Sequence, residues 1–141
     1  MRHLKAGKKL SRTQEHRKAM FRNMITALFE KGKIETTVAK AKALRPLAEK
    51  VITLAKRNNL HSKKTAFSFI TKKPVVKKLF EEIAPAYKDR PGGYTRIIRS
   101  YIRRGDAVEM AILEMVGSET PAPAQEKGKP AKAEKKEKEK K

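Results

Sequence analysis

The fold class is decided by residues 94–116, YTRIIRSYIRRGDAVEMAILEMV, whose side chains alternate between two faces. Residues 94–103 predict one strand, with one face formed by Thr95, Ile97, Arg99 and Tyr101. Residues 108–116 predict the return strand, which turns one face inward through Ala111, Leu113 and Met115. The turn between the strands is supplied by Arg104, Gly105 and Asp106, so this stretch predicts a β-hairpin.

Before a turn cluster at residues 89–93, the apolar residues follow a helical period instead. Ser11 and Gln14 match a capping box and predict a helix of about twenty residues that ends at Gly32. Its inward stripe is predicted to be Phe21, Met24, Ile25 and Leu28. If Phe21 is fully buried there, Phe21→Ala should cost about 3–5 kcal/mol of stability.

Further helices are predicted over residues 38–56, 62–71 and 74–84. The first has Thr37 as its cap and an inward stripe of Ala41, Leu44, Ala48, Val51, Ile52 and Ala55. Pro46 lies within it and either bends the helix or begins it, because proline cannot donate to the carbonyl of Lys42. The two shorter helices turn inward Ala66, Phe67 and Ile70, and Val75, Val76, Leu79, Phe80 and Ile83, respectively.

Residues 33–37, KIETT, are β-branched enough to predict a short strand that joins the edge of the hairpin. The expected architecture is therefore α+β, with about four helices packed on a small, mostly antiparallel sheet.

Most of the positive charge belongs to the part of the chain expected to fold. The chain has 36 Lys and Arg against 15 Asp and Glu, a net charge of +21. Residues 117–141 lack large apolar side chains, so we expect a disordered tail, and its eight lysines and five glutamates contribute only +3. We expect residues 1–11 to form an extended basic arm and residues 12–116 to form the α+β domain. Such a charge is most easily tolerated beside a polyanion.

The composition excludes several classes of protein. Without cysteine there is no disulfide scaffold, cysteine zinc site or thiol enzyme. No apolar run exceeds four residues, which excludes a membrane span and a secretory signal and indicates a soluble, intracellular protein. The three histidines lack the spacing of metal ligands, and no nucleophile, base and acid converge in the sequence. We therefore expect no catalysis, metal, cofactor or small-molecule substrate.

The basic residues instead indicate binding to nucleic acid, because Arg and Lys neutralise phosphates. They gather on the hairpin, at Arg96, Arg99, Arg103 and Arg104, and on the first helix, at Arg12, Arg17 and Arg22. The arm adds Arg2, Lys5, Lys8 and Lys9. Tyr94 and Tyr101 flank the hairpin arginines and either stack on an unpaired base or pack in the core, the latter being at least as good an interpretation for Tyr101.

Charge alone is also compatible with an architectural DNA-binding protein. A protein of the membrane surface is the weaker alternative, because the apolar stripe of the first helix is needed for the core.

Several motifs decide between these classes by resemblance. They are the opening MRH, residues 16–24 (HRKAMFRNM), residues 52–56 (ITLAK), residues 92–97 (GGYTRI) and residues 104–106 (RGD). In this order, over about residues 1–116, they closely resemble the large-subunit ribosomal protein seventeen family of bacteria.

The resemblance implies a non-catalytic structural protein of the cytoplasmic ribosome. Members of that family bind large-subunit ribosomal RNA on the solvent side, near the exit of the polypeptide tunnel, among neighbouring ribosomal proteins. The family's RNA-contacting arm and first helix correspond to Arg2, His3, Lys5, Lys8, Lys9, Arg12, His16, Arg17 and Arg22. The segment 92–96 matches too, whereas the tail 117–141 lies beyond the shared part.

Overall fold

The computed structural model describes residues 7–117, and the predictions for residues 1–6 and 118–141 lie outside this range. The helices are α1 (Gln14–Lys31), α2 (Val38–Lys56), α3 (Leu60–Phe69) and α4 (Lys73–Lys78), followed by the π-helical turn η1 (Leu79–Ile83) and the short α5 (Ala84–Ala86). The strands are β1 (Lys33–Thr37), β2 (Thr95–Ile102) and β3 (Glu109–Met115). The α+β class is confirmed.

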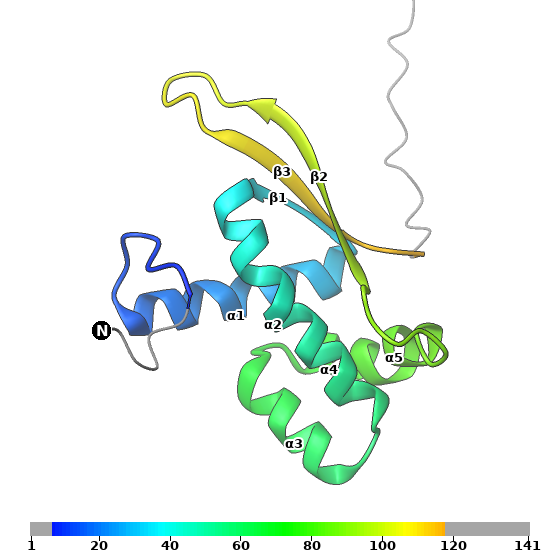
Figure 1. Ribbon diagram of the computed structural model, residues 1–141. Coiled ribbons are helices and arrows are strands. Elements are labelled where there is room, and N and C mark those ends of the chain that lie inside the picture. The colour runs from blue at the N-terminus through cyan, green and yellow to red at the C-terminus, as the bar shows by residue number, and fades with distance from the viewer. Residues whose placement is uncertain (1–6, 118–141) are drawn as a thin grey trace, which may run out of the picture.

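The three strands form one antiparallel sheet in the order β1-β3-β2. The early strand joins the hairpin as predicted, by pairing with β3. In Figure 1 the sheet lies on one side of α1 and α2, the distal end of the hairpin extends beyond the helices, and α3 lies toward the opposite end of α2. The alternation predicted for β3 is confirmed, because Ala111, Leu113 and Met115 are buried.

A β-bulge changes the alternation of β2. Arg99 pairs with Ala111 and Ile102 pairs with Glu109, so β2 has one more residue than β3 in this interval. Ile102, opposite Glu109, lies on the same face as Arg99, opposite Ala111, because Glu109 and Ala111 are two residues apart on β3. Tyr101, one residue before Ile102, therefore lies on the other face with Ile98, and its predicted place on the face of Thr95 is wrong.

Helix α1 begins two residues later than the capping box suggests. The N-cap is Thr13, whose hydroxyl accepts a hydrogen bond from the backbone N–H of His16 at 3.4 Å. Gly32 ends the helix in the left-handed region (φ 77°) and donates to the carbonyl of Leu28, as predicted. The predicted inward stripe is confirmed, because Ile25 and Leu28 are buried and Phe21 and Met24 pack against the core. Phe21 is only half-buried, so the condition set for its stability estimate is not met, and the fully buried ring of α1 is Phe29.

Helix α2 passes through the middle of the domain. All six residues of its predicted stripe are buried, which confirms the period of 3.6. Pro46 lies inside the continuous helix, so the alternative that the helix begins there is wrong. Thr37 is the N-cap as predicted, but its side chain makes no capping hydrogen bond.

The core forms where α2 meets α1, the sheet and the later helices. Its fully buried members include Phe29, Leu44, Ile52, Leu79 and Leu113, contributed by α1, α2, η1 and β3. Phe67, predicted to face inward from α3, is exposed, and Ser62 is buried on that helix instead. From the last helical region Val75, Val76, Leu79 and Ile83 are buried as predicted, and Phe80 packs at the edge of the core.

Candidate nucleic-acid interface

The segment before α1 is held against the helix by Arg17. The Arg17 guanidinium Nη1 donates to the carbonyl of Lys9 at 3.2 Å and to that of Arg12 at 3.4 Å. Leu10 and Ser11 both have positive φ, which folds this segment back on itself. Backbone carbonyls carry no net negative charge, so these hydrogen bonds leave the positive charge of Arg17 unneutralised.

A groove of about 500 Å³ lies between this segment, α1 and α2. Its cationic side chains are Lys8, Arg17, Lys42 and Lys50. Its apolar side chains are Phe21, Ala43, Pro46 and Leu47. Among the described residues, no carboxylate lines this groove. Such a surface attracts an anion and also offers apolar contacts.

Several neighbouring cations have no acidic partner. Within residues 7–117, no ion pair is formed by Lys8, Lys9, Arg12, Lys18, Lys42 or Lys50. His16 is exposed on the first turn of α1. The structure thus brings together the predicted residues Lys8, Lys9, Arg12 and Arg17. The predicted residues Arg2, His3 and Lys5 lie outside the described residues.

Arg22 has a different environment from the other arginines of α1. Its Nε donates to the carbonyl of Phe69 at 3.0 Å, and its Nη2 hydrogen-bonds to the carbonyl of Ser68. These carbonyls belong to the last turn of α3, where backbone acceptors lack helical partners. The arginine therefore joins α1 to the end of α3, a structural role that the sequence analysis did not foresee.

Three of the four hairpin arginines are neutralised by acidic side chains. Arg96 pairs with Glu114 at 2.6 Å across the strands, and Arg103 pairs with Asp106 at 2.5 Å across the turn. Arg99 lies 3.9 Å from Glu109. The hydrogen bond and charge of Arg103 lower the pKa of Asp106, which keeps this carboxylate ionised. Among the described residues, only Arg104 of the four has no acidic partner.

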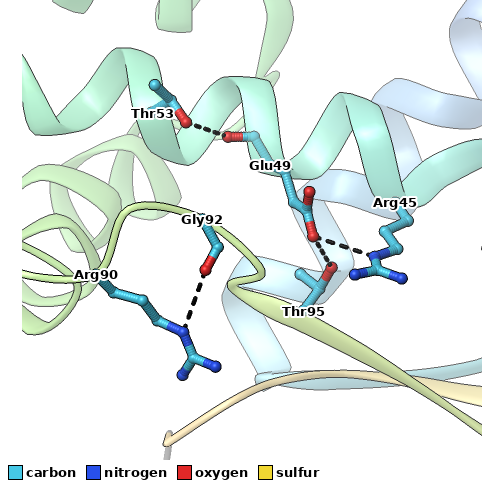
Figure 2. A network of polar contacts seen from close by, with 6 residues as sticks. All are labelled: Arg45, Glu49, Thr53, Arg90, Gly92 and Thr95. Atoms are coloured by element: carbon cyan, nitrogen blue, oxygen red, sulfur yellow. Dashed lines mark hydrogen bonds and ion pairs between the residues drawn. The ribbon is translucent and has the colours of Figure 1, made fainter.

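The GGYTR segment, residues 92–96, is fixed to α2 by polar contacts. Figure 2 shows Glu49 accepting hydrogen bonds from Arg45 at 3.1 Å and from Thr95 at 3.2 Å. The same view shows Arg90 Nε donating to the carbonyl of Gly92 at 3.2 Å. Gly93 has φ 65°, a conformation that side chains disfavour. The segment thus sets where β2 begins.

Tyr94 is buried, with 2% of its surface exposed. Its ring packs against that of Tyr87 at a centroid distance of 5.3 Å, and Lys56 Nζ lies 3.3 Å from its hydroxyl. A hydrogen bond with Thr53 lowers the pKa of Tyr94, and Lys56 adds to this effect against the opposing effect of burial. This ring has no free face for a base, so the stacking predicted for Tyr94 does not fit the structure. Tyr101 is the exposed tyrosine instead.

Other kinds of site find little support in the described residues. Within residues 7–117, no three His, Asp or Glu side chains gather in an arrangement that would hold a metal ion. None of the helices in the same range has the length and apolar character needed to cross a bilayer.

Comparison with known proteins places this architecture in a family. The family model described as ribosomal protein L17 matches residues 20–116. The chain belongs to the ribosomal protein L17 family. The match includes all of α2, the GGYTR segment and the hairpin. The L17 domain therefore contains these parts of the candidate interface.

Individual relatives agree with this assignment. A protein of Halothermothrix orenii named large ribosomal subunit protein bL17 is 61% identical over 109 residues, which are 77% of this chain and 96% of that protein. A bL17 protein of Pelobacter propionicus is 59% identical over 119 residues, 84% of this chain and 94% of the relative. One of Desulfotalea psychrophila is 58% identical over 117 residues, 83% and 91% of the two chains.

The sequence analysis missed two groove lysines of this L17 chain, Lys42 and Lys50. They are eight residues apart on α2, with Pro46 midway, so a helical period of four places all three along one side of the helix. This spacing can be seen in the sequence. Only the folded structure shows that the segment before α1 lies opposite these lysines and forms the other wall of the groove.

Proposed function

We propose that the protein binds and stabilises large-subunit ribosomal RNA near the exit of the polypeptide tunnel. Family membership supports the coarser statement directly: the chain is a structural, non-enzymatic constituent of the large ribosomal subunit, in the bacterial cytoplasm. Nothing in the comparisons supports the alternative of an architectural DNA-binding protein. The position at the tunnel exit and the neighbouring ribosomal proteins as partners follow from the resemblance of the sequence motifs.

The observation that carries the RNA-binding proposal is the uncompensated charge on the segment before α1, on α1 and on α2. There, Lys8, Arg12, Lys18, Lys42 and Lys50 lack acidic partners within the described residues. Cations in this state release counterions from RNA when they approach its phosphates. The proposed orientation turns this side toward RNA, and recognition depends on RNA shape more than on base edges.

Salt dependence tests the proposal. If about six phosphates are contacted, affinity for a large-subunit RNA transcript should fall roughly a thousandfold between about 50 and 200 mM salt. Duplex DNA at equal phosphate concentration is the control and should bind more weakly. Binding that is insensitive to salt would rule out this mechanism.

Assembly provides a second test, which addresses the arm. A variant lacking residues 1–10 should fold but should co-sediment less with large subunits in a sucrose gradient, because it loses the basic segment before α1. Normal co-sedimentation of this variant would show that the arm is dispensable.

A further inference from the structure

We propose that the groove between the segment before α1 and helix α2 holds one unpaired RNA nucleotide, with its phosphate at the lysines and its base against Phe21. This inference rests on the proposed function, because it assigns a specific site within the RNA-binding surface. It adds Phe21, Lys42 and Lys50 to the residues expected from the sequence.

The shape of the groove is set by contacts within the protein. Arg17 extends from α1 and donates to the carbonyls of Lys9 and Arg12, so the segment before α1 is held as one wall. The opposite wall is α2, where Lys42 and Lys50 are eight residues apart. At 1.5 Å per residue they are separated by about 12 Å along the helix axis. The two lysines therefore leave the helix at separate points along this wall.

The chemistry of the lining favours a nucleotide over a simple anion. Lys8, Arg17, Lys42 and Lys50 supply four positive charges, and residues 7–117 contribute no acid to the lining. The remaining surface is apolar, formed by Phe21, Leu47 and their neighbours. A phosphate alone would use the cations and leave the apolar surface bare. An unpaired nucleotide uses both, because its phosphate is anionic and its base has a face that stacks on an aromatic ring.

Phe21 is suited to this role by its incomplete burial. It is half-buried at the edge of the core, whereas Ile25, Leu28 and Phe29 of the same helix are fully covered. A residue needed only for the core would gain by being covered as they are. The ring instead reaches the wall of a cationic groove, where a base would complete its burial.

The test measures how the affinity for a large-subunit RNA transcript depends on salt. The variant Lys42→Ala/Lys50→Ala should bind more weakly and should reduce the slope of log affinity against log salt by about one, for the one phosphate that the two lysines are proposed to hold. The matched control Lys64→Ala/Lys73→Ala loses the same charge from exposed positions on α3 and α4 and should keep the wild-type slope. Equal slopes for the two variants would overturn the inference, because charge alone would then explain binding.

A second variant tests the base. Phe21→Leu keeps an apolar side chain but removes the aromatic face, so affinity at fixed salt should fall about tenfold with an unchanged slope. A thermal melt checks that this variant folds. Wild-type affinity in a folded Phe21→Leu would overturn the stacking contact. If the groove lysines are covered by a neighbouring ribosomal protein and not by RNA, the groove binds an acidic peptide. That result would overturn the nucleotide site.

The two proposals fail in different ways. If the wild-type protein shows no salt-dependent binding, the proposed function fails. If the wild type binds with a steep slope and the groove variants behave like the control, only the nucleotide site fails.

Discussion

The groove and the hairpin are both rich in basic residues, but they differ in how their charges are balanced. In the hairpin, Arg96, Arg99 and Arg103 each lie beside a carboxylate of the same hairpin. In the groove, four cations line a surface to which the described residues contribute no acid. A phosphate approaching the three paired arginines must displace an existing partner, whereas one approaching the groove need not. The number of arginines in a segment is therefore a poor guide to how much uncompensated charge it presents.

The largest expected effect comes from removing the core that supports both regions. Phe29 is fully buried in α1, so Phe29→Ala should lower the free energy of unfolding by about 3–5 kcal/mol. Urea denaturation measures this loss, and RNA binding should fail with it. Phe21→Ala is the matched control and should cost less, because Phe21 is only partly buried at the edge of the core. Equal losses for the two variants would contradict the described burial.

A smaller loss of stability is expected from a variant that affects the hairpin but not the groove. Glu49 joins α2 to the start of β2 by accepting from Thr95, and it also accepts from Arg45 (Figure 2). Glu49→Gln removes the charge that strengthens these bonds and should cost about 1–2 kcal/mol. Hydrogen exchange should quicken in β2 while the amides of α1 near the groove keep their protection. Uniform loss of protection would show that the two regions are not independent.

The segment before α1, which forms one wall of the groove, allows the effect of shape to be compared with the effect of charge. Arg17→Lys keeps a positive charge but loses the planar group that binds the carbonyls of Lys9 and Arg12. We expect RNA affinity to fall about fivefold because the segment before α1 is no longer held in place. A filter-binding titration measures this change, with Lys18→Arg as a control that keeps charge at an exposed position. Unchanged affinity would indicate that charge, and not the shape of the wall, determines binding.

The smallest effect is expected in the hairpin. Arg96 is exposed and paired with Glu114, so Arg96→Ala should change stability by less than about 1 kcal/mol and RNA affinity by less than about threefold. Glu114→Gln should free the arginine and raise RNA affinity slightly. A large loss of affinity in Arg96→Ala would place the hairpin, rather than the groove, at the RNA.

The regular elements could be predicted because their periods are undisturbed. Every predicted stripe residue of α2 is buried, and β3 alternates as expected. The bulge in β2 has no such signal, since it depends on pairing with β3. It moves Tyr101 to the outer face, which the simple alternation could not predict.

The interface was harder to predict because contacts between distant residues decide which charges are free. Arg22 binds carbonyls of α3 that are 46 and 47 residues away. Tyr94 is covered by packing against Tyr87 and α2, which its position beside basic residues does not reveal. Lys42 and Lys50 gain their significance only when the segment before α1 lies opposite them. The sequence contained the charge, and the fold determined which part of it is available.

The most direct test of the central claim is ultraviolet crosslinking of the protein to RNA within purified large subunits, followed by mass spectrometry of RNA-linked peptides. Our interpretation predicts RNA adducts on peptides from the segment before α1, from the first half of α1 around Phe21, and from α2 between Lys42 and Lys50. Peptides from the hairpin, residues 95–115, should carry few or none. Adducts confined to the hairpin would contradict the claim that RNA binds at the groove.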